Sequence, residues 1–148
     1  PMAAGLSLPT ENIDLFRAKL NRQQTLTEKE LTPVTWIDVP MPVSYASKKL
    51  VEQLRVLEPF GKGNEKPVFA DRKLTVRSAN MIGKNKNVLK MQLEDTHGHI
   101  VDAIQFKVEE EDMPLRGKEI SIVYYPDINE FRGNQTLQFI VQEWCYTT

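Results

Sequence analysis

The C-terminal half of the chain, from Val68 onward, is a succession of short β-rich runs separated by turn residues. Five runs can be read, at 68–82, 88–94, 100–106, 119–125 and 135–144. They alternate apolar with polar residues or are rich in β-branched and aromatic ones, and the breaks carry Gly, Pro, Asn or Asp. The longest break, between the third and fourth runs, has room for a helical turn. The pattern predicts five strands and restricts this half to a small all-β fold.

The first run changes the phase of its alternation partway along. Leu74 and Val76 share one phase, whereas Ala79 and Met81 share the other. A bulge or sharp coil near Arg77–Ser78 would let one long strand serve both ends of a small barrel. Five strands with a bent first strand and a helical insert predict an OB-fold, and a generic five-stranded sandwich is the alternative.

The first 67 residues are typical of helices and extended segments. The stretch 10–24 predicts a helix capped by Thr10, with an apolar side made of Ile13, Phe16 and Leu20. The following extended segment has buried candidates Val34, Trp36 and Ile37, and its prolines at 40 and 42 exclude a central strand.

A second helix is predicted over about 44–57, opened by Ser44 and ended by Pro59. Its apolar stripe consists of Ala46, Leu50, Leu54 and Leu57. The prediction is therefore a mainly β protein with N-terminal helices.

Composition restricts the class of protein. The chain has 148 residues, 41% of them hydrophobic and 26% charged, which is ordinary for a soluble globular domain. No apolar run is long enough to span a bilayer, and no signal segment is present, so we expect a cytoplasmic protein without a membrane partner. Cys145 cannot form an internal disulfide, and we expect it to serve as a small apolar residue. The first eight residues look like the end of an element, so we expect a trimmed chain.

A net charge of −1 conceals two blocks of opposite sign. Residues 60–93 contain six Lys and two Arg against two acids, whereas residues 94–112 contain seven acids against one Lys. Such a distribution can orient a polyanion on one face, and clustered charges on a solvated surface are the alternative.

Two loops are the candidate binding elements of the predicted barrel. In an OB-fold, nucleic acid crosses the second and third strands, flanked by the loop between strands one and two and the loop between strands four and five. Here these loops are 83–87, with Lys84 and Lys86, and 126–134, with Phe131 and Arg132. A plain hairpin turn is the alternative for the first loop, and an anchor packed on the barrel is the alternative for Phe131.

The second predicted strand divides its side chains between the two faces of the barrel wall. Its leucines 89 and 93 and Met91 would point inward, which leaves Lys90 and Gln92 outward on the binding face with Arg77.

The spacing of residues argues against a metal site, a catalytic site and a phosphate-binding loop. His97 and His99 in a tight turn beside Asp95 lack further ligands at metal-like spacing, so solvated turn residues are the better interpretation. No catalytic serine or cysteine arrangement is present. The segment 57–69, LEPFGKGNEKPVF, could be a connector, a phosphate loop or a joint between modules. It lacks the GxxxxGK[ST] pattern and precedes a strand, which excludes the phosphate loop.

Several motifs together resemble one family. LEPFGKGNEKPVF, VLKMQL, VDAIQFK and DINEFRGNQTLQFIV occur in the order found in the C-terminal part of the RecJ family, bacterial single-stranded-DNA-specific 5′→3′ exonucleases of the DHH superfamily. The opening PMAAGLSLP resembles residues after the Gly-Gly-His motif of that family's DHHA1 domain. The resemblance covers essentially the whole chain. Many relatives have HLK where this chain has VLK at 88–90, which makes Lys90 the safer contact.

The resemblance implies a division into a DHHA1 remnant with a trailing strand and helix (1–24), a linker (25–66) and an OB-fold (67–148). It implies a parent exonuclease that uses Mn²⁺ or Mg²⁺ in a core outside this chain, which itself would hold no cofactor and be inactive. Expected partners are single-stranded DNA and the DHH/DHHA1 core, with a single-stranded-DNA-binding protein or a RecQ-type helicase as further candidates. Roles in DNA repair and recombination follow from the family. A docking module without DNA contact is the alternative.

With the resemblance, the segment 57–69 is interpreted as a joint. Its six joint residues are Pro59, Phe60, Gly61, Gly63, Asn64 and Pro67. In this interpretation Pro59 ends the helix, the two glycines permit a tight reversal, and Pro67 starts the first strand. Lys62 and Lys66 would contact DNA only in a secondary role.

Overall fold

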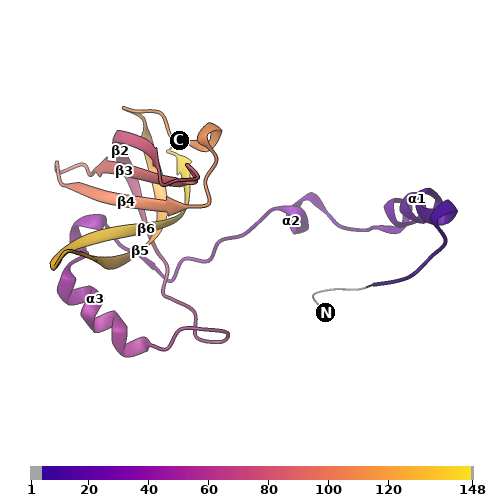
Figure 1. The fold of residues 1–148 in the computed structure, drawn as a ribbon, viewed down its shortest axis with the longest axis horizontal. Coiled ribbons are helices and arrows are strands. Elements are labelled where there is room, and N and C mark those ends of the chain that lie inside the picture. The colour runs from indigo at the N-terminus through magenta and orange to yellow at the C-terminus, as the bar shows by residue number, and fades with distance from the viewer. Residues whose placement is uncertain (1–4, 148) are drawn as a thin grey trace. The chain divides into compact units, whose positions relative to one another are not determined.

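The computed structural model describes residues 5–147. The chain divides into two compact units, with the boundary between Thr35 and Trp36. Figure 1 shows the fold with its helices and strands labelled. The stretch 36–66, which the sequence analysis assigned to a linker, belongs to the same unit as the barrel.

The first unit contains two helices without buried residues. A 3₁₀ turn at Thr10–Asn12 leads into α1 (Ile13–Gln23), and α2 (Glu28–Leu31) follows. The predicted helix is present, but the cap was wrong, because Thr10 lies inside the 3₁₀ turn and no side chain caps it. Residues 5–9 form no strand, and positions 1–4 of the predicted trailing strand lie outside the described residues.

The second unit is a closed barrel. Its strands are β2 (Phe69–Ile82), β3 (Val88–Glu94), β4 (Ile100–Phe106), β5 (Glu119–Phe131) and β6 (Asn134–Tyr146). They pair in the order β2-β3-β4-β6-β5, and β2 closes the barrel by also pairing with β5. A 3₁₀ turn at Glu110–Asp112 lies between the third and fourth of these strands. The mainly β OB-type architecture is thus confirmed.

The long first strand, β2, serves both ends of the barrel as its change of phase predicted. Its second half pairs with β3 and its first half with β5. The register with β3 shifts between Val76 and Ser78, which is the predicted bulge position. A further shift lies between Asp71 and Leu74 in the pairing with β5.

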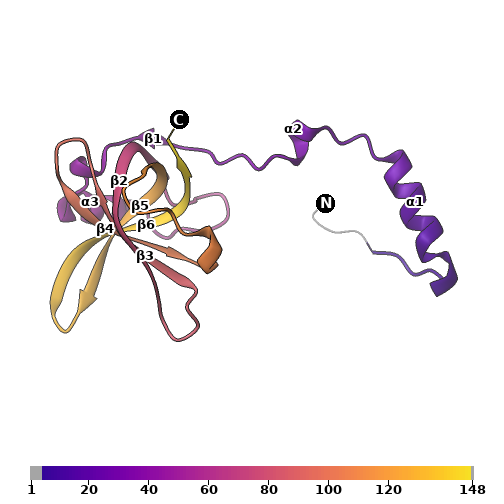
Figure 2. The same cartoon turned by 90° about the horizontal axis from the view of Figure 1, so that it is seen from above.

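The last two strands are longer than the sequence analysis predicted. The stretch 126–134 is the end of a β-hairpin, because β5 continues to Phe131 and β6 begins at Asn134. Figure 2 shows this hairpin in yellow, projecting from the barrel. Pro126 lies fully buried within β5, opposite Phe139. The pairing of β2 with β5 stops at Tyr124, so β5 has one strand neighbour fewer where the proline removes a backbone donor.

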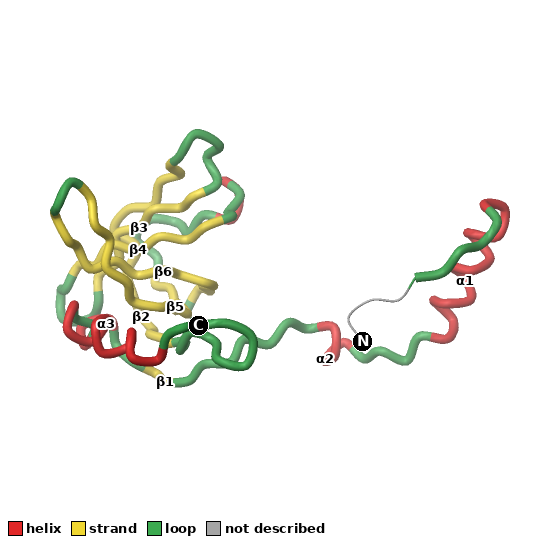
Figure 3. The backbone as a smooth tube through the Cα atoms, turned by 60° about the horizontal axis from the view of Figure 1, so that its bottom comes forward, coloured by secondary structure: helices red, strands yellow, loops and turns green. Residues whose placement is uncertain are grey.

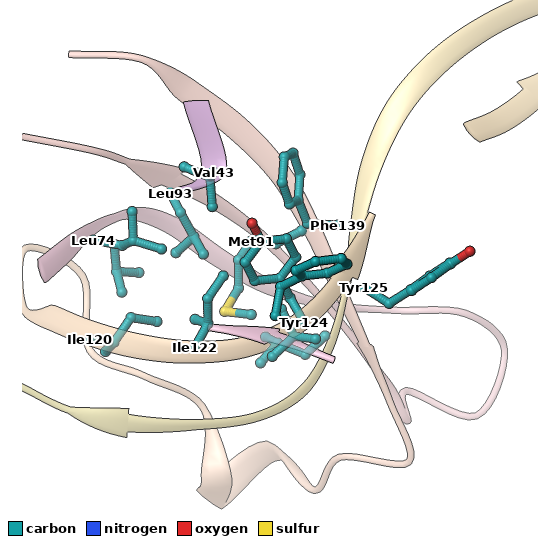
Figure 4. Packing of buried hydrophobic residues seen from close by; sticks show 14 of the residues in the cluster. Val43, Leu74, Met91, Leu93, Ile120, Ile122, Tyr124, Tyr125 and Phe139 are labelled. Carbon is teal, nitrogen blue, oxygen red and sulfur yellow. The ribbon is translucent and has the colours of Figure 1, made fainter. Parts of the chain in front are cut away.

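The core fills the barrel interior, as Figure 4 shows. Leu74 and Val76 from β2, Ile120 and Ile122 from β5, and the rings of Tyr124 and Phe139 are among its fully buried members. The two rings pack with centroids 5.2 Å apart. On β3, Leu89, Met91 and Leu93 are buried whereas Lys90 and Gln92 are exposed, so alternation predicted the two sides of this strand.

A segment before the barrel packs onto it. It contains β1 (Val39–Pro40), a 3₁₀ turn (Val43–Tyr45), α3 (Lys48–Leu54) and a second 3₁₀ turn (Arg55–Leu57). The strand β1 adds to β2 in parallel, at the side of its first half. Figure 3 shows α3 in red against the strands, and the Lys48 ammonium donates to the Gln135 carbonyl over 2.6 Å.

Carboxylates hold this segment in place. The backbone N–H of Val43 donates to Asp71 Oδ2 over 2.7 Å, and that of Val68 donates to Asp38 Oδ2 over 2.8 Å. The Tyr124 hydroxyl donates to the Met41 carbonyl over 2.9 Å. Val43 is only 1% exposed and belongs to the barrel core, so the segment completes the core.

Several predictions for this segment were wrong. Ser47, not Ser44, caps α3, by accepting from the Leu50 N–H. Val51 is the fully buried residue of the helix, whereas Leu57 is exposed. Trp36 is 84% exposed, and Val34 and Ile37 are exposed too. In the barrel, Cys145 on β6 was expected to be a small apolar residue but is exposed.

Candidate nucleic-acid interface

The outer face of β2, β3 and β4 is the surface that the sequence analysis singled out. Strand register aligns its outward residues in rows across the three strands. From the 83–87 turn toward the 95–99 turn, the rows are Ile82–Val88–Phe106, Asn80–Lys90–Ile104 and Ser78–Gln92–Asp102. We call these nine residues the outer face. Its two ends differ in chemistry.

Three lysines lie at the end of the outer face near the 83–87 turn. Lys84 and Lys86 are exposed in that turn, and Lys90 is exposed on β3. The turn is tight, with positive φ at Gly83 and Lys86. Within the part of the chain that the structure describes, none of these three lysines forms an ion pair with a carboxylate. Their charges are thus available to an anion from solvent.

Arg77 forms an ion pair with a carboxylate of the protein itself. Its Nε lies 2.9 Å from Glu94 Oε2, an acid at the far end of β3. The arginine side chain is just over half exposed, so this ion pair is partly solvated. Arg77 stands beside the bulge of β2 and is separated from the lysine end of the outer face.

Gln92 also has an acidic neighbour. It lies opposite Asp102 on β4, and its Nε2 donates to Asp102 Oδ1 over 3.5 Å, at the long limit of a hydrogen bond. The antiparallel pairing of β4 with β3 therefore places Asp102, an acid from the 94–112 block, next to the strand that carries Lys90. The charge blocks of the sequence do not form separate faces.

The outer face carries apolar side chains that the sequence analysis did not assign to a site. Phe106 is 55% exposed, and Ile82 is exposed in the same row. Ile104 lies partly exposed next to Lys90. The run IVDAIQF is apolar in both phases, so alternation alone could not tell which of its residues faces solvent. An exposed ring beside cations is the combination that binds single-stranded nucleic acid.

Phe131 and Arg132 lie at the end of the β5–β6 hairpin. Arg132 and Gly133 both have positive φ, which makes the turn tight. The Phe131 ring is 64% exposed and the Arg132 guanidinium lies 5.1 Å from its centroid, a cation–π geometry. The ring is thus no anchor packed on the barrel. This pair lies on a different hairpin from the three lysines.

The segment 57–69 folds back on itself. Gly61 and Asn64 exchange both backbone hydrogen bonds, at 2.8 and 3.0 Å. The Asn64 side chain donates to the carbonyls of Leu57 and Pro59. Only Gly63 of the two glycines has positive φ, at 85°, so the reversal depends on Gly63. The peptide bond before Pro59 is cis.

The same segment is also attached to the barrel. The Phe60 ring meets Tyr125 edge-on with centroids 6.3 Å apart. The Lys66 ammonium lies 4.6 Å from the Tyr125 ring and 5.7 Å from the Phe60 ring. Pro67 precedes the first barrel strand by two residues, since β2 begins at Phe69. The segment is therefore an ordered loop packed on β5.

The histidine turn is organised by Asp95, whose side chain is 8% exposed. Burial alone would raise the pKa of this carboxyl, but the bonds from the His99 and His97 N–H groups and from the His99 ring outweigh it and lower the pKa. Among the described residues no group of three or more His, Cys, Asp or Glu is arranged to hold a metal ion. Nor does any described helix have the length and apolarity to cross a membrane.

Comparisons with known proteins agree with this geometry. The family described as RecJ OB domain matches residues 37–143. The chain is 35% identical to the single-stranded-DNA-specific exonuclease RecJ of Haemophilus influenzae over 95% of its length and 25% of the relative's. It is 30% identical to the RecJ of Bacillus subtilis over 97% of its length and 18% of the relative's. It therefore spans a quarter or less of these relatives.

A solved structure has the same fold. The crystal structure of RecJ in complex with Mn²⁺ from Thermus thermophilus aligns with a TM-score of 0.66. The alignment covers 96% of this chain and 20% of that protein, at 16% sequence identity. At this identity the likeness supports the fold.

Proposed function

This chain belongs to the RecJ OB domain family, and we propose that it binds single-stranded DNA as one region of a longer exonuclease. The observation that carries the proposal is the outer face with the adjoining 83–87 turn. There, three lysines that form no ion pair among the described residues lie beside an exposed aromatic ring. Lys84, Lys86 and Lys90 would neutralise phosphates, and Phe106 would stack on a base. Backbone charge and base surfaces would thus be bound by neighbouring parts of one face.

The β5–β6 hairpin would supply a second contact. Phe131 and Arg132 combine an exposed ring with a guanidinium, so they suit a base and its phosphate. Gln92 would line the path. Arg77 would contribute less than the lysines, because Glu94 already neutralises part of its charge.

The rest of the parent enzyme would carry the chemistry. In this proposal, residues 1–24 belong to the preceding DHHA1 domain, residues 25–66 lead into the barrel, and residues 67–148 form the DNA-binding OB-fold. Hydrolysis would take place in a core outside this chain with Mn²⁺ or Mg²⁺, which would activate water and stabilise the phosphoryl transfer. The barrel would guide the strand toward that core, and the chain by itself would be inactive.

The segment 57–69, which lies within the barrel unit, would be the joint that contacts the core and sets the angle between barrel and core. Phe60 and Lys66 attach one side of the loop to Tyr125, and the Gly61–Asn64 pairing stiffens the reversal. A stiff loop packed on the barrel can hold a fixed angle to a neighbouring module, which a flexible connector could not. In the full-length enzyme, replacing Gly61 and Gly63 with valine is expected to lower processivity more than the replacement weakens oligonucleotide binding by this chain.

The binding proposal is tested by fluorescence anisotropy with a labelled oligonucleotide of about 12 nucleotides, within the range of OB-fold site sizes. The logarithm of the affinity should fall with the logarithm of salt concentration by about 0.7 per phosphate contacted. The triple replacement of Lys84, Lys86 and Lys90 by alanine should reduce this slope by about 2. Phe106→Ala should weaken binding at every salt concentration and leave the slope unchanged, because a ring releases no counterions.

A matched control removes three lysines from other surfaces, namely Lys19, Lys29 and Lys49. It changes net charge equally and should keep most of the slope. Equal losses in the two triple variants would refute a localised site. No binding of the unaltered chain even at low salt would refute direct DNA contact and favour a docking module.

A further inference from the structure

The outer face carries an acid at a position where a bound DNA phosphate would be repelled. Asp102 is exposed on β4, directly opposite Gln92 and diagonal to Lys90. A surface that bound only phosphates across its whole width would place one of them against this carboxylate. The nucleic acid must therefore present another of its groups here.

The register of the β-strands indicates the path of a DNA strand that contacts both the 83–87 turn and the β5–β6 turn. Such a DNA strand would pass Asp102. The strands β4 and β6 are parallel, with Ala103 opposite Phe139. The β5–β6 turn therefore lies toward the Ile100 end of β4, whereas the lysine turn lies toward its Phe106 end. A DNA strand that reaches from one turn to the other crosses the middle of β4, where the outward residues are Ile104 and Asp102.

The Gln92–Asp102 pair presents hydrogen-bond acceptors to that strand. A carboxylate only accepts, so the Gln92 amide turns its nitrogen toward Asp102, at 3.5 Å. This leaves the Gln92 carbonyl and the second Asp102 oxygen as acceptors. The neighbouring Ile104 and Phe106 offer apolar surface on which a base can lie. Acceptors beside an apolar surface match the edge of a base that carries an exocyclic amino group.

We propose that Asp102, with Gln92, reads the bases of bound single-stranded DNA and favours those that carry an amino group over thymine. This inference rests on the proposed DNA binding and names its specificity. Cytosine offers the two hydrogens of its N4 amino group to the carboxylate. Thymine offers one ring N–H between two carbonyl oxygens, and the carboxylate repels both oxygens. Phosphates then follow the lysine side of the face while bases meet β4.

The test compares two pyrimidine oligonucleotides of equal length, about 12 nucleotides of oligo(dC) and of oligo(dT). Binding is measured at a slightly alkaline pH, where the cytosine ring is unprotonated. The unaltered chain should bind oligo(dC) about five-fold or more tightly than oligo(dT), the lower end of discrimination by a base contact. Asp102→Asn replaces an acceptor by a group that both donates and accepts. The ratio should then fall to about one, and affinity for oligo(dT) should rise.

Glu52→Gln is the matched control, since it removes one negative charge from an exposed position of α3, which packs against β5 and lies outside the outer face. It should shift both affinities equally and keep their ratio. Equal binding of the two oligonucleotides by the unaltered chain, or a ratio that survives in Asp102→Asn, would overturn the reading of bases while leaving DNA binding intact. Failure to bind either oligonucleotide at low salt would instead overturn the proposed function, and the specificity with it.

Discussion

Replacing Asp71 with alanine is expected to detach the segment before the barrel. Asp71 Oδ2 accepts the Val43 N–H over 2.7 Å, and Oδ1 accepts the Arg72 N–H over 2.7 Å. Val43 is 1% exposed, so water cannot replace the lost acceptor without opening the segment. Arg72 is exposed, and its N–H can bind water instead.

The magnitude follows from this difference in burial. Hydrogen bonds to charged groups contribute about 1.5–3 kcal/mol, and leaving a buried donor unpaired costs about 1–3 kcal/mol. The Val43 N–H should dominate, so Asp71→Ala should lower the free energy of unfolding by about 2–3 kcal/mol. Asp71→Asn keeps one acceptor oxygen and should cost about half as much.

The chain contains its own control. Asp38 Oδ2 accepts the Val68 N–H over 2.8 Å, which is the same chemistry between the same two segments at an exposed position. Asp38→Ala should cost less than about 1 kcal/mol, because water replaces the carboxylate. Urea unfolding followed by tryptophan fluorescence and by circular dichroism measures all three variants, and coincident transitions would justify a two-state analysis.

Similar costs for Asp71→Ala and Asp38→Ala would refute the reasoning, since burial would then not decide the energy of these bonds. A loss below about 1 kcal/mol in Asp71→Ala would show that the segment contributes little to the stability of the barrel.

Two further predictions concern pH and backbone conformation. Burial, and then the negative charge of Asp71, raise the pKa of the Tyr124 hydroxyl in the folded state. The folded protein therefore keeps this proton, and the associated stability is complete below pH of about 10 and is lost as the pH rises further. Tyr124→Phe should reduce this loss when the free energy of unfolding is measured as a function of pH. Some loss of unfolding free energy with rising pH should remain, because the pKa of Tyr125 is raised as well, again mainly by burial. An unchanged dependence of the unfolding free energy on pH would contradict the assignment to Tyr124. Gly63→Ala should cost about 1–2 kcal/mol in urea unfolding, since φ is +85° there. Gly61→Ala should be nearly neutral, because its φ is not positive and no atom lies within 4 Å of an added Cβ; equal costs would argue against a reversal that depends on Gly63.

Local pattern was enough to predict the five barrel strands and the class of fold, although it predicted neither β1 nor the full length of β5 and β6. The alternation of Leu89, Lys90, Met91 and Gln92 determined which side of β3 is buried, because side chains of a strand point to opposite faces whatever its partners are. The change of phase near Arg77 likewise predicted the bulge, since a bulge is a local insertion.

Predictions failed where the outcome depended on distant contacts. Pro126 was interpreted as a loop residue, yet it lies inside β5, because the neighbouring strand β2 ends its pairing before this position. Trp36 was expected to be buried, and Val51 was missed, because only docking on the barrel decides which apolar residues of 36–57 are covered. The local helix and strand propensities of residues 36–57 carry no information on how this segment docks on the barrel.

The candidate site shows the same division. The sequence by itself determined that Lys84, Lys86, Lys90 and Gln92 face solvent, because turn chemistry and alternation are local properties. The tertiary structure alone decided that Arg77 is paired with Glu94 and that Asp102 lies beside Gln92. The antiparallel pairing of β2 with β3 places Glu94 near Arg77, and that of β3 with β4 places Asp102 near Gln92. These pairings bring acids of the 94–112 block next to residues of the basic 60–93 block. A polarised sequence therefore became a mixed surface, on which we propose that the lysines bind phosphates and that Asp102 contacts a base.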